Sequence, residues 1–284
     1  MFTAATRLVG LLAYPASHSF SPQIHNAAFR ALGLDWVYLA FQVEPSRLPA
    51  AVEGIRALGF AGANVTIPHK ESITAYLDEI HPLARLIGAV NTVVLREGKL
   101  VGYNTDAGGF LRSLEEAGID PAGKGALILG AGGAARAVAF ALARAGCMAL
   151  ILANRTEARA RELARALGEA GYRAVEVVPW EEGSLAGVVP AVDMIINTTS
   201  IGMSPDREGV PFAPEFLRPR QIVCDVVYNP PETRFLEGAR RRGCRVLSGL
   251  GMLLYQGAEA FALWTGREAP VEVMREVLYN LALR

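Results

Sequence analysis

The stretch Ala126-Leu-Ile-Leu-Gly-Ala-Gly-Gly-Ala-Ala-Arg136 decides the fold of this chain. Four apolar residues of strand length lead into a glycine-rich turn, and a segment of small residues with helical character follows as far as Ala145. A second strand-like run covers Ala149 to Ala153. Strand, turn, helix and strand in this order form a βαβ unit, so the pattern predicts a parallel sheet covered by helices.

The same alternation of apolar runs and helical-period segments extends in both directions, which makes the whole chain α/β. We expect an N-terminal open α/β substrate domain (residues 1–105 with 250–284) and a Rossmann-type, doubly wound nucleotide domain (residues 106–249), with a cleft between them. Further strands are predicted at 8–12, 37–42, 62–66, 174–178, 194–197, 222–226 and 245–247. Helices are predicted at 22–32, where Ser21 would be the N-cap, at 48–58, at 106–117 and in the tail 252–284.

Charge and cysteine content exclude several classes of protein. The 284 residues carry 28 basic and 28 acidic side chains, and a nucleic-acid-binding protein needs a basic surplus that this chain lacks. Three cysteines without CxxC spacing predict neither a disulfide framework nor a metal site, and they fit a cytoplasmic protein. Each apolar run falls short of the roughly 18 residues that a membrane span needs.

The glycine-rich turn predicts a dinucleotide site. Glycines let the backbone approach a pyrophosphate, which the free N–H groups of the following helix N-terminus bind. Ala135 stands where the common fingerprint has its third Gly or Ala. The turn itself would be formed by Gly130, Ala131, Gly132, Gly133 and Ala134.

The end of the next strand predicts which nucleotide binds. An NAD site usually carries an acidic residue there, whereas this chain reads Asn154-Arg155-Thr156 with Arg159 one turn later. A guanidinium forms charge-assisted bonds to a 2′-phosphate, so the pattern favours NADP. The alternative is that both arginines are ordinary solvated side chains in an arginine-rich chain, and Glu157 argues weakly against NADP.

Three N-terminal clusters of polar residues predict a second site: Ser17–Pro22, Asn64–Lys70, and Gly88–Thr92 with Asn104–Asp106. Each is expected to follow a strand. Their hydroxyls, amides and charges suit a polyhydroxylated carboxylic acid, and either Lys70 or Asp106 could donate to the alkoxide that develops when a ketone is reduced. His69, next to Lys70 in an extended segment, is expected to point elsewhere and to have a packing or surface role.

At these residues the chain closely resembles the shikimate dehydrogenase family. The motifs that carry the resemblance run in order along the chain: SxSP, NVTxPxK, GAVNT, NTD, GAGGAxR, NRT, DxxYNP and GxxMLxxQ. The resemblance implies NADPH-dependent reduction of 3-dehydroshikimate to shikimate, a step of aromatic amino acid biosynthesis.

The resemblance also implies roles for single residues. Lys70 and Asp106 would form the catalytic pair, with the identity of the formal acid left open. The substrate would be bound by these two and by Ser19, Ser21, Thr66, Asn91, Tyr228 and Gln256. Thr198, Val226 and Gly249 would contact the cofactor.

Two other functions stay open on the residues alone. One is a quinate/shikimate dehydrogenase with relaxed cofactor use, against which Arg155 and Arg159 count. The other is a non-catalytic ligand-sensing module of the same fold, against which the retained Lys70 and Asp106 count. In either case the partner is a small molecule, without nucleic acid or membrane, and the protein would be a monomer or a homodimer.

Overall fold

The computed structural model describes residues 2–283, and these divide into two compact units. The first unit combines the chain up to Gly109 with the chain from Leu254 onward, and the second spans Phe110–Leu253. Both divisions fall inside helices, namely α4 (Asp106–Glu116) and α9 (Leu250–Thr265). Each unit is described below by itself.

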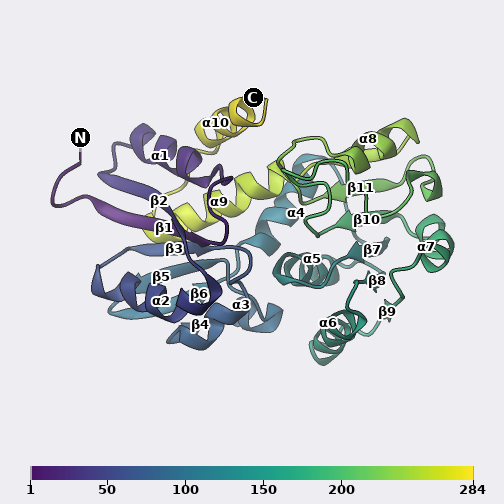
Figure 1. Cartoon of the computed structure of the whole chain (residues 1–284), viewed down its shortest axis with the longest axis horizontal. Helices are drawn as coiled ribbons and strands as arrows, with labels where there is room; N and C mark the ends of the chain where they lie inside the picture. The colour runs from purple at the N-terminus through teal and green to yellow at the C-terminus, as the bar shows by residue number, and fades with distance from the viewer. Residues whose placement is uncertain (1, 284) are drawn as a thin grey trace. The chain divides into compact units, whose positions relative to one another are not determined.

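The first unit is built on a six-stranded mixed sheet in the order β2-β1-β3-β5-β6-β4 (Figure 1). β1 pairs in parallel with both β2 and β3, and β4 is parallel to β6. The strands are β1 (Arg7–Ala13), β2 (Trp36–Gln42), β3 (Gly62–Val65), β4 (Glu79–Ile80), β5 (Thr92–Arg96) and β6 (Lys99–Tyr103).

Strand β5 runs antiparallel to both of its neighbours, β3 and β6, which the expectation of a parallel sheet did not include. The cause is local. β5 and β6 are joined by the two residues Glu97 and Gly98, both with positive φ (52° and 78°), and a connection this short makes a hairpin, whereas a parallel crossover needs about a dozen residues. The reversal puts the first residue of β5 at the same sheet edge as the carboxyl ends of β3 and β6.

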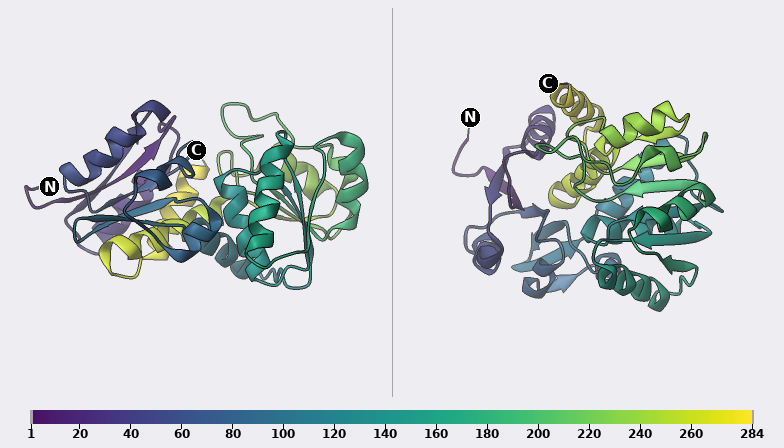
Figure 2. Two further views of the ribbon diagram at one scale, coloured as in Figure 1. Left: turned by 90° about the horizontal axis from the view of Figure 1, so that it is seen from below. Right: turned by 45° about the vertical axis from the view of Figure 1, so that its right-hand side comes forward.

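Helices cover both faces of this sheet. α1 (Ser21–Ala31) packs against α10 (Val271–Ala282) and β2, and the aromatic contacts of Phe29 with Phe261 join α1 to α9. α2 (Leu48–Ala57) and α3 (Pro82–Ile87) enclose the core on the other face together with the short helix η2 (Ser72–Tyr76) (Figure 2). The buried members of this core include Ile55 of α2 and the strand residues Leu12, Val93 and Leu100, and the strand residues alternate with residues of the opposite face.

Two predicted details of the helices need correction. Ser21 is the first residue of α1, and the N-cap is Phe20, not Ser21. The Ser21 N–H donates to Ser19 Oγ (3.2 Å). The predicted helical tail is two helices, α9 and α10, interrupted at Gly266, whose φ is +68°, and at Pro270, which caps α10. Of that tail, Arg284 lies outside the described residues.

The second unit contains a six-stranded, fully parallel sheet in the order β12-β11-β10-β7-β8-β9. The chain moves outward from β7 to β8 and β9, then returns to the other side of β7 for β10, β11 and β12. This is the strand order of a doubly wound nucleotide-binding sheet, with its switch point between β7 and β10. The strands are β7 (Gly125–Leu129), β8 (Ala149–Ala153), β9 (Val175–Val177), β10 (Met194–Asn197), β11 (Ile222–Asp225) and β12 (Arg245–Leu247).

Helices pack on both faces of this sheet (Figure 2). α5 (Gly133–Arg144) and α6 (Glu157–Glu169) contact β7, β8 and β9. α7 (Glu182–Val188) and α8 (Arg234–Arg241) share a core with inward-facing strand residues such as Leu127, Ile195 and Val223. The architecture of this unit agrees with the fold class that the Gly130 turn and its flanking strands predict.

Candidate functional site

The polar clusters of the first unit meet at one edge of its sheet. β3 ends at Val65, β6 ends at Tyr103, and β5 begins at Thr92, whose Cα pairs with Asn64 on one side and Tyr103 on the other. The Gly88–Thr92 part of the third cluster therefore leads into a strand, where it was expected to follow one, whereas its Asn104–Asp106 part follows β6 as expected. Because β5 is antiparallel, its start lies beside the ends of its neighbours, and Asn91 faces the same space as the segments after β3 and β6.

The segment that carries Lys70 is fixed by backbone bonds on several sides. The Thr66 N–H donates to Leu12 O (3.1 Å), and the His69 N–H donates to Thr66 O (2.8 Å). Lys70 O accepts from Val90 N (2.8 Å). His69 is buried and its Nε2 lies 2.7 Å from Val43 O, which requires a proton on that nitrogen. The packing role expected for His69 is confirmed, and its bond anchors the residue before Lys70.

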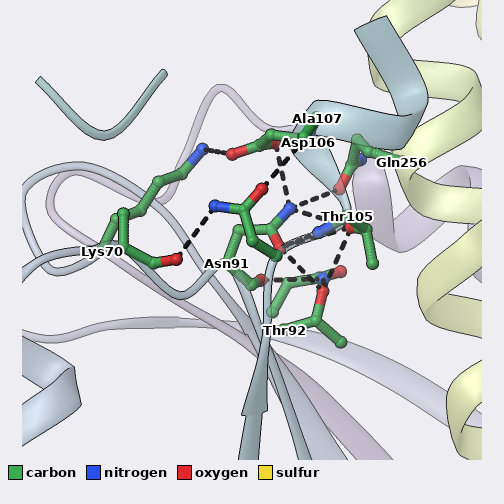
Figure 3. A network of polar contacts seen from close by, with 10 residues as sticks. Lys70, Asn91, Thr92, Thr105, Asp106, Ala107 and Gln256 are labelled. Atoms are coloured by element: carbon green, nitrogen blue, oxygen red, sulfur yellow. Dashed lines mark hydrogen bonds and ion pairs between the residues drawn. The ribbon is translucent and has the colours of Figure 1, made fainter. Parts of the chain in front are cut away.

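Lys70 and Asp106 form an ion pair in which Nζ donates to Oδ2 at 2.6 Å (Figure 3). Their side chains are 14% and 5% exposed, so little water screens the pair. Asp106 is also the first residue of α4, where the helix N-terminus favours a negative charge. Within residues 2–283, Asp106 is the hydrogen-bond partner of the Lys70 ammonium. Two of the three N–H bonds of Lys70 Nζ are therefore left for a ligand.

Asn91 joins this pair to the tail of the chain. Its Nδ2 donates to Thr105 Oγ1 (2.9 Å), Asp106 Oδ1 (3.0 Å) and Gln256 Oε1 (3.3 Å) (Figure 3). Its Oδ1 accepts from the Thr105 N–H at 2.8 Å. The buried amide therefore holds both the carboxylate and the α9 residue Gln256 in fixed positions, although Gln256 is 165 residues away in sequence.

A second layer of buried polar side chains supports Asn91, and the sequence did not single these out as site residues. Tyr38 donates from its hydroxyl to Asn64 Oδ1 (2.9 Å), and Asn64 Nδ2 donates to Asn91 O (3.1 Å) and Thr92 Oγ1 (3.0 Å). Asn64 and Thr92 could have been predicted from the sequence, because they belong to the same motifs, NVTxPxK and GAVNT, as Thr66 and Asn91. Tyr38 carries no such signal, because its strand reads as core.

Glu259 is another residue that sequence reasoning missed. It lies on α9 one turn after Gln256, and its carboxyl packs against the first turn of α4, where a Cβ added to Gly108 would lie 2.5 Å from Glu259 Oε2. Desolvation of the carboxyl and, secondarily, the charge of Asp106 raise the pKa of Glu259 to about 7. Near neutral pH a large fraction of this second carboxyl is therefore protonated and uncharged, close to Asp106.

Two of the predicted substrate residues lie on the segment that enters α1. Ser21 is buried, and Ser19 is partly buried with its Oγ bound to the Ser21 N–H. Thr66 is partly buried directly after β3. These three belong to the first unit, as do Lys70, Asn91, Asp106 and Gln256, whereas Tyr228 follows β11 in the second unit.

In the second unit, the glycine turn follows β7 at the switch point of the sheet. Gly130 has φ +113°, and a Cβ there would lie 2.6 Å from Thr198 Oγ1, so a larger residue is excluded. Gly132 is the N-cap of α5, and no side chain of the described part of the chain caps this helix. Apart from its chain neighbours, no described residue has an atom within 4 Å of a Cβ placed at Gly132. The turn, which includes Ala131, Gly133 and Ala134, therefore has both free N–H groups and room for a phosphate.

The residues after β8 have the features of a 2′-phosphate site. Asn154 Nδ2 donates to Thr156 O (2.8 Å), which closes the turn into α6. Arg155 and Arg159 are exposed on this turn and on the first turn of the helix. Glu157, the acidic residue that counted against NADP, forms an ion pair with Arg161 on the helix surface. These residues fit a nucleotide that carries an additional phosphate.

The other predicted cofactor residues gather around the carboxyl ends of β10 and β11. Thr198 follows β10 and donates from its Oγ1 to Leu129 O, the last residue of β7, at 2.6 Å. Val226 follows β11, and a Cβ added to Gly249 would lie 2.2 Å from Val226 O. The absence of a side chain at Gly249 is thus what allows the two segments to pass each other.

The described residues contain no cluster of three or more His, Cys, Asp or Glu side chains arranged to hold a metal ion. Among the helices described for residues 2–283, none has both the length and the apolar character that spanning a bilayer requires.

Comparison with known proteins accounts for this combination of sites. The family model for the shikimate dehydrogenase substrate binding domain matches residues 11–93. The shikimate/quinate 5-dehydrogenase model matches residues 114–203, and the shikimate 5′-dehydrogenase C-terminal domain model matches residues 249–279.

Individual relatives cover nearly the whole chain. The chain is 63% identical over 275 residues to shikimate dehydrogenase (NADP(+)) of Moorella thermoacetica, which covers 97% of this chain and 93% of that protein. It is 40% identical, with a TM-score of 0.86 and coverage of 96% and 99%, to the shikimate 5-dehydrogenase of Thermus thermophilus solved with NADP(H) and shikimate. Quinate dehydrogenase from Corynebacterium glutamicum, solved with NAD, is 35% identical with a TM-score of 0.89 and coverage of 97% and 99%. The chain belongs to the shikimate dehydrogenase family.

Proposed function

We propose that this protein is an NADP-dependent shikimate dehydrogenase, which reversibly reduces the ketone of 3-dehydroshikimate to the alcohol of shikimate. The observation that carries the proposal is the Lys70–Asp106 pair, 2.6 Å apart and held at the sheet edge by Asn91. A proton donor fixed among hydroxyls and amides is what reduction of a polyhydroxylated ketone requires.

Most of the residues that bind and orient the substrate in this proposal belong to the first unit, and Tyr228 belongs to the second. Ser19 and Ser21 bind the carboxylate, while Thr66, Asn91, Tyr228 and Gln256 contact the carboxylate or the ring hydroxyls. In this proposal, residues 1–105 with 250–284 form the substrate domain and residues 106–249 form the nucleotide domain. Asn91 and Gln256 are already hydrogen-bonded to each other, so their polar atoms are held in place before the substrate arrives.

Lys70 handles the proton. NADPH, when bound, supplies the hydride that adds to the carbonyl carbon. Lys70 Nζ donates a proton to the carbonyl oxygen as negative charge develops on it, so that the product is the alcohol, and the amine regains a proton from solvent. Asp106 holds the ammonium in position through Oδ2. In the oxidation of shikimate the same groups act in reverse.

The residues of the second unit hold the cofactor. The N–H groups that begin α5 bind the pyrophosphate at the turn from Gly130 to Ala134, as the open space at Gly132 allows. The guanidinium groups of Arg155 and Arg159 bind the 2′-phosphate, with Asn154 and Thr156 shaping their turn. Thr198, Val226 and Gly249 complete the cofactor site.

The decisive assay measures oxidation of shikimate and of quinate, each with NADP and with NAD, by the absorbance of the reduced cofactor. We expect the highest kcat/KM with shikimate and NADP. A higher value for quinate with NAD would support a quinate dehydrogenase instead, the activity named for the Corynebacterium glutamicum protein. Binding of shikimate without turnover would support a ligand-sensing module.

A further inference from the structure

We propose that Asp225 is a positioning residue of the cofactor site, which holds the loops after β10 and β11 in the arrangement that binds NADP. The inference rests on the proposed function, because it concerns the same cofactor. Asp225 is the last residue of β11 and only 2% exposed, and it is not among the residues that contact the cofactor in the proposal above.

The Asp225 carboxylate accepts three hydrogen bonds. Oδ1 accepts from Asn197 Nδ2 (3.0 Å) and from the Val227 N–H (3.0 Å), while Oδ2 accepts from Thr233 Oγ1 (2.8 Å). The three donors come from β10, from the residues directly after β11 and from the residue before α8. Burial raises the pKa of Asp225 to about 7, whereas these three bonds act in the opposite direction.

Asn197 continues the network into the neighbouring loop. It is fully buried at the end of β10, and its Nδ2 also donates to Ile201 O (3.3 Å). Its Oδ1 accepts from Thr199 N (3.1 Å) and Thr199 Oγ1 (2.7 Å). Both ends of the segment 197–201 are therefore bound to one amide, whose orientation is set by Asp225.

Thr233 closes the second loop in a similar way. Its hydroxyl donates to Asp225 and accepts from the Leu236 N–H (3.3 Å), where it caps α8. The carboxylate thus bridges eight residues along the chain, from the end of β11 to the start of α8. The segment 226–232, which contains Val226 and Tyr228, is held at both ends.

The residues fixed in this way are those that the proposal places against the cofactor. Thr198 lies between Asn197 and Thr199, and its hydroxyl reaches back to Leu129 O beside the Gly130 turn. Val226 lies between Asp225 and Val227, and Val227 O accepts from Gly249 N (3.2 Å). One buried carboxylate therefore connects the Thr198, Val226 and Gly249 segments, next to the switch point of the sheet.

The test is the variant Asp225→Asn in the full chain. The amide keeps the size of the side chain, but its NH2 group cannot accept a hydrogen bond, so at least one of the three donors loses its acceptor. We expect the Kd for NADP to rise at least tenfold and the KM for shikimate to rise by a smaller factor, because Tyr228 lies in the segment that Asp225 holds. At saturating substrates kcat is expected to change less than threefold. Titration calorimetry and initial rates measure these quantities.

Gln221→Met is the matched control. Gln221 directly precedes β11 at the opposite end of the strand, is also buried, and donates to Val189 O (2.6 Å) and Val192 O (2.7 Å) while accepting from Arg218 N (2.7 Å). Gln221→Met removes these three buried or partly buried hydrogen bonds at the end of β11 that lies away from the loops. We expect both variants to lower Tm, and only Asp225→Asn to weaken NADP binding when both are measured well below their Tm.

Thr233→Val extends the test to a milder change. It removes one bond to the carboxylate and keeps Asp225, and we expect a threefold to fivefold rise in the Kd for NADP. If Asp225→Asn does not fold, this variant decides the question. An unchanged Kd for NADP in folded Asp225→Asn overturns the inference. If Thr233→Val is the deciding variant, an unchanged Kd for NADP in that variant overturns it. The inference is also overturned if Gln221→Met raises the Kd for NADP by the same factor. Failure of the unaltered protein to bind NADP at all would instead refute the proposed function.

Discussion

Lys70 and Asp106 lie 36 residues apart in sequence and form a 2.6 Å ion pair whose carboxylate is tied through its other oxygen to Asn91. The same chain contains a second lysine pair of equal length, between Lys99 and Glu79, whose side chains are 62% and 53% exposed. Burial and the Asn91 bond, and not the distance between the charges, distinguish the first pair from a surface ion pair.

This contrast provides the first prediction. Lys70→Ala is expected to lower kcat at least a hundredfold with a modest change in substrate KM, since general acid catalysis contributes about 10² to 10⁴. Lys99→Ala removes an exposed ion pair of the same length and is expected to leave kcat within twofold. Steady-state rates with shikimate and NADP measure both, and near-normal turnover of Lys70→Ala would contradict the catalytic role of Lys70.

Asn91→Ala is expected to reduce the free energy of unfolding by about 2 to 3 kcal/mol, because buried partners that lose a hydrogen bond cost about 1 to 3 kcal/mol each. The affected partners are the Thr105 N–H and the Asp106 carboxylate. Thr265→Ala, which removes a partly exposed bond to Phe261 O, is expected to change stability by no more than about 0.5 kcal/mol. Urea unfolding measures both, and equal losses would show that the Asn91 network is not specially stabilising.

Cofactor preference is expected to depend on Arg155. Arg155→Ala should raise the KM for NADP at least tenfold with little effect on NAD, as loss of a charged hydrogen bond worth about 1.5 to 3 kcal/mol implies. Arg161→Ala is the control, because Arg161 lies on the helix that follows Arg155 and its guanidinium pairs with Glu157. Equal effects of Arg155→Ala on the two cofactors would remove the argument for a 2′-phosphate contact.

A histidine in the core predicts how stability depends on pH. His25 is stacked on Tyr38 with ring centroids 4.6 Å apart, and its Nδ1 has no hydrogen-bond partner among residues 2–283. Burial lowers the pKa of His25 from 6.5 to about 3. Between pH 6.5 and 3 the unfolded state binds a proton that the folded state does not. Acidification below pH 6.5 therefore favours unfolding, by up to about 1.4 kcal/mol per pH unit from this group.

The variant His25→Phe isolates that contribution. The difference in unfolding free energy between the unaltered protein and His25→Phe should be constant above pH 6.5 and should shift progressively in favour of the variant below it. Urea unfolding at a series of pH values measures the difference. A difference that stays constant down to about pH 4 would show that His25 is protonated in the folded state.

Local sequence was sufficient for much of the fold. The strand, glycine turn and helix from Ala126 to Arg144 are determined by apolar runs and backbone freedom within about 20 residues, and the structure confirms them. Local sequence was insufficient at the start of α1, where it did not determine whether Ser19 or Ser21 accepts a hydrogen bond from a free N–H group of the helix. The choice depends on how the segment before α1 is held, which neighbouring residues alone do not determine.

By itself, then, the sequence determined the α/β class, the glycine turn and the polar motifs from which Lys70, Asn91 and Asp106 were predicted. Only the tertiary structure decided that Asn91 lies at the same edge as the ends of β3 and β6, because that follows from the antiparallel pairing of β5. The tertiary structure also decided that Gln256 is hydrogen-bonded to Asn91, and that Asp225 joins the end of β10 to the start of α8. The bond between Asn91 and Gln256 spans 165 positions and the one from β10 to Asp225 spans 28, and periodicity within one element contains no information about pairing over such distances.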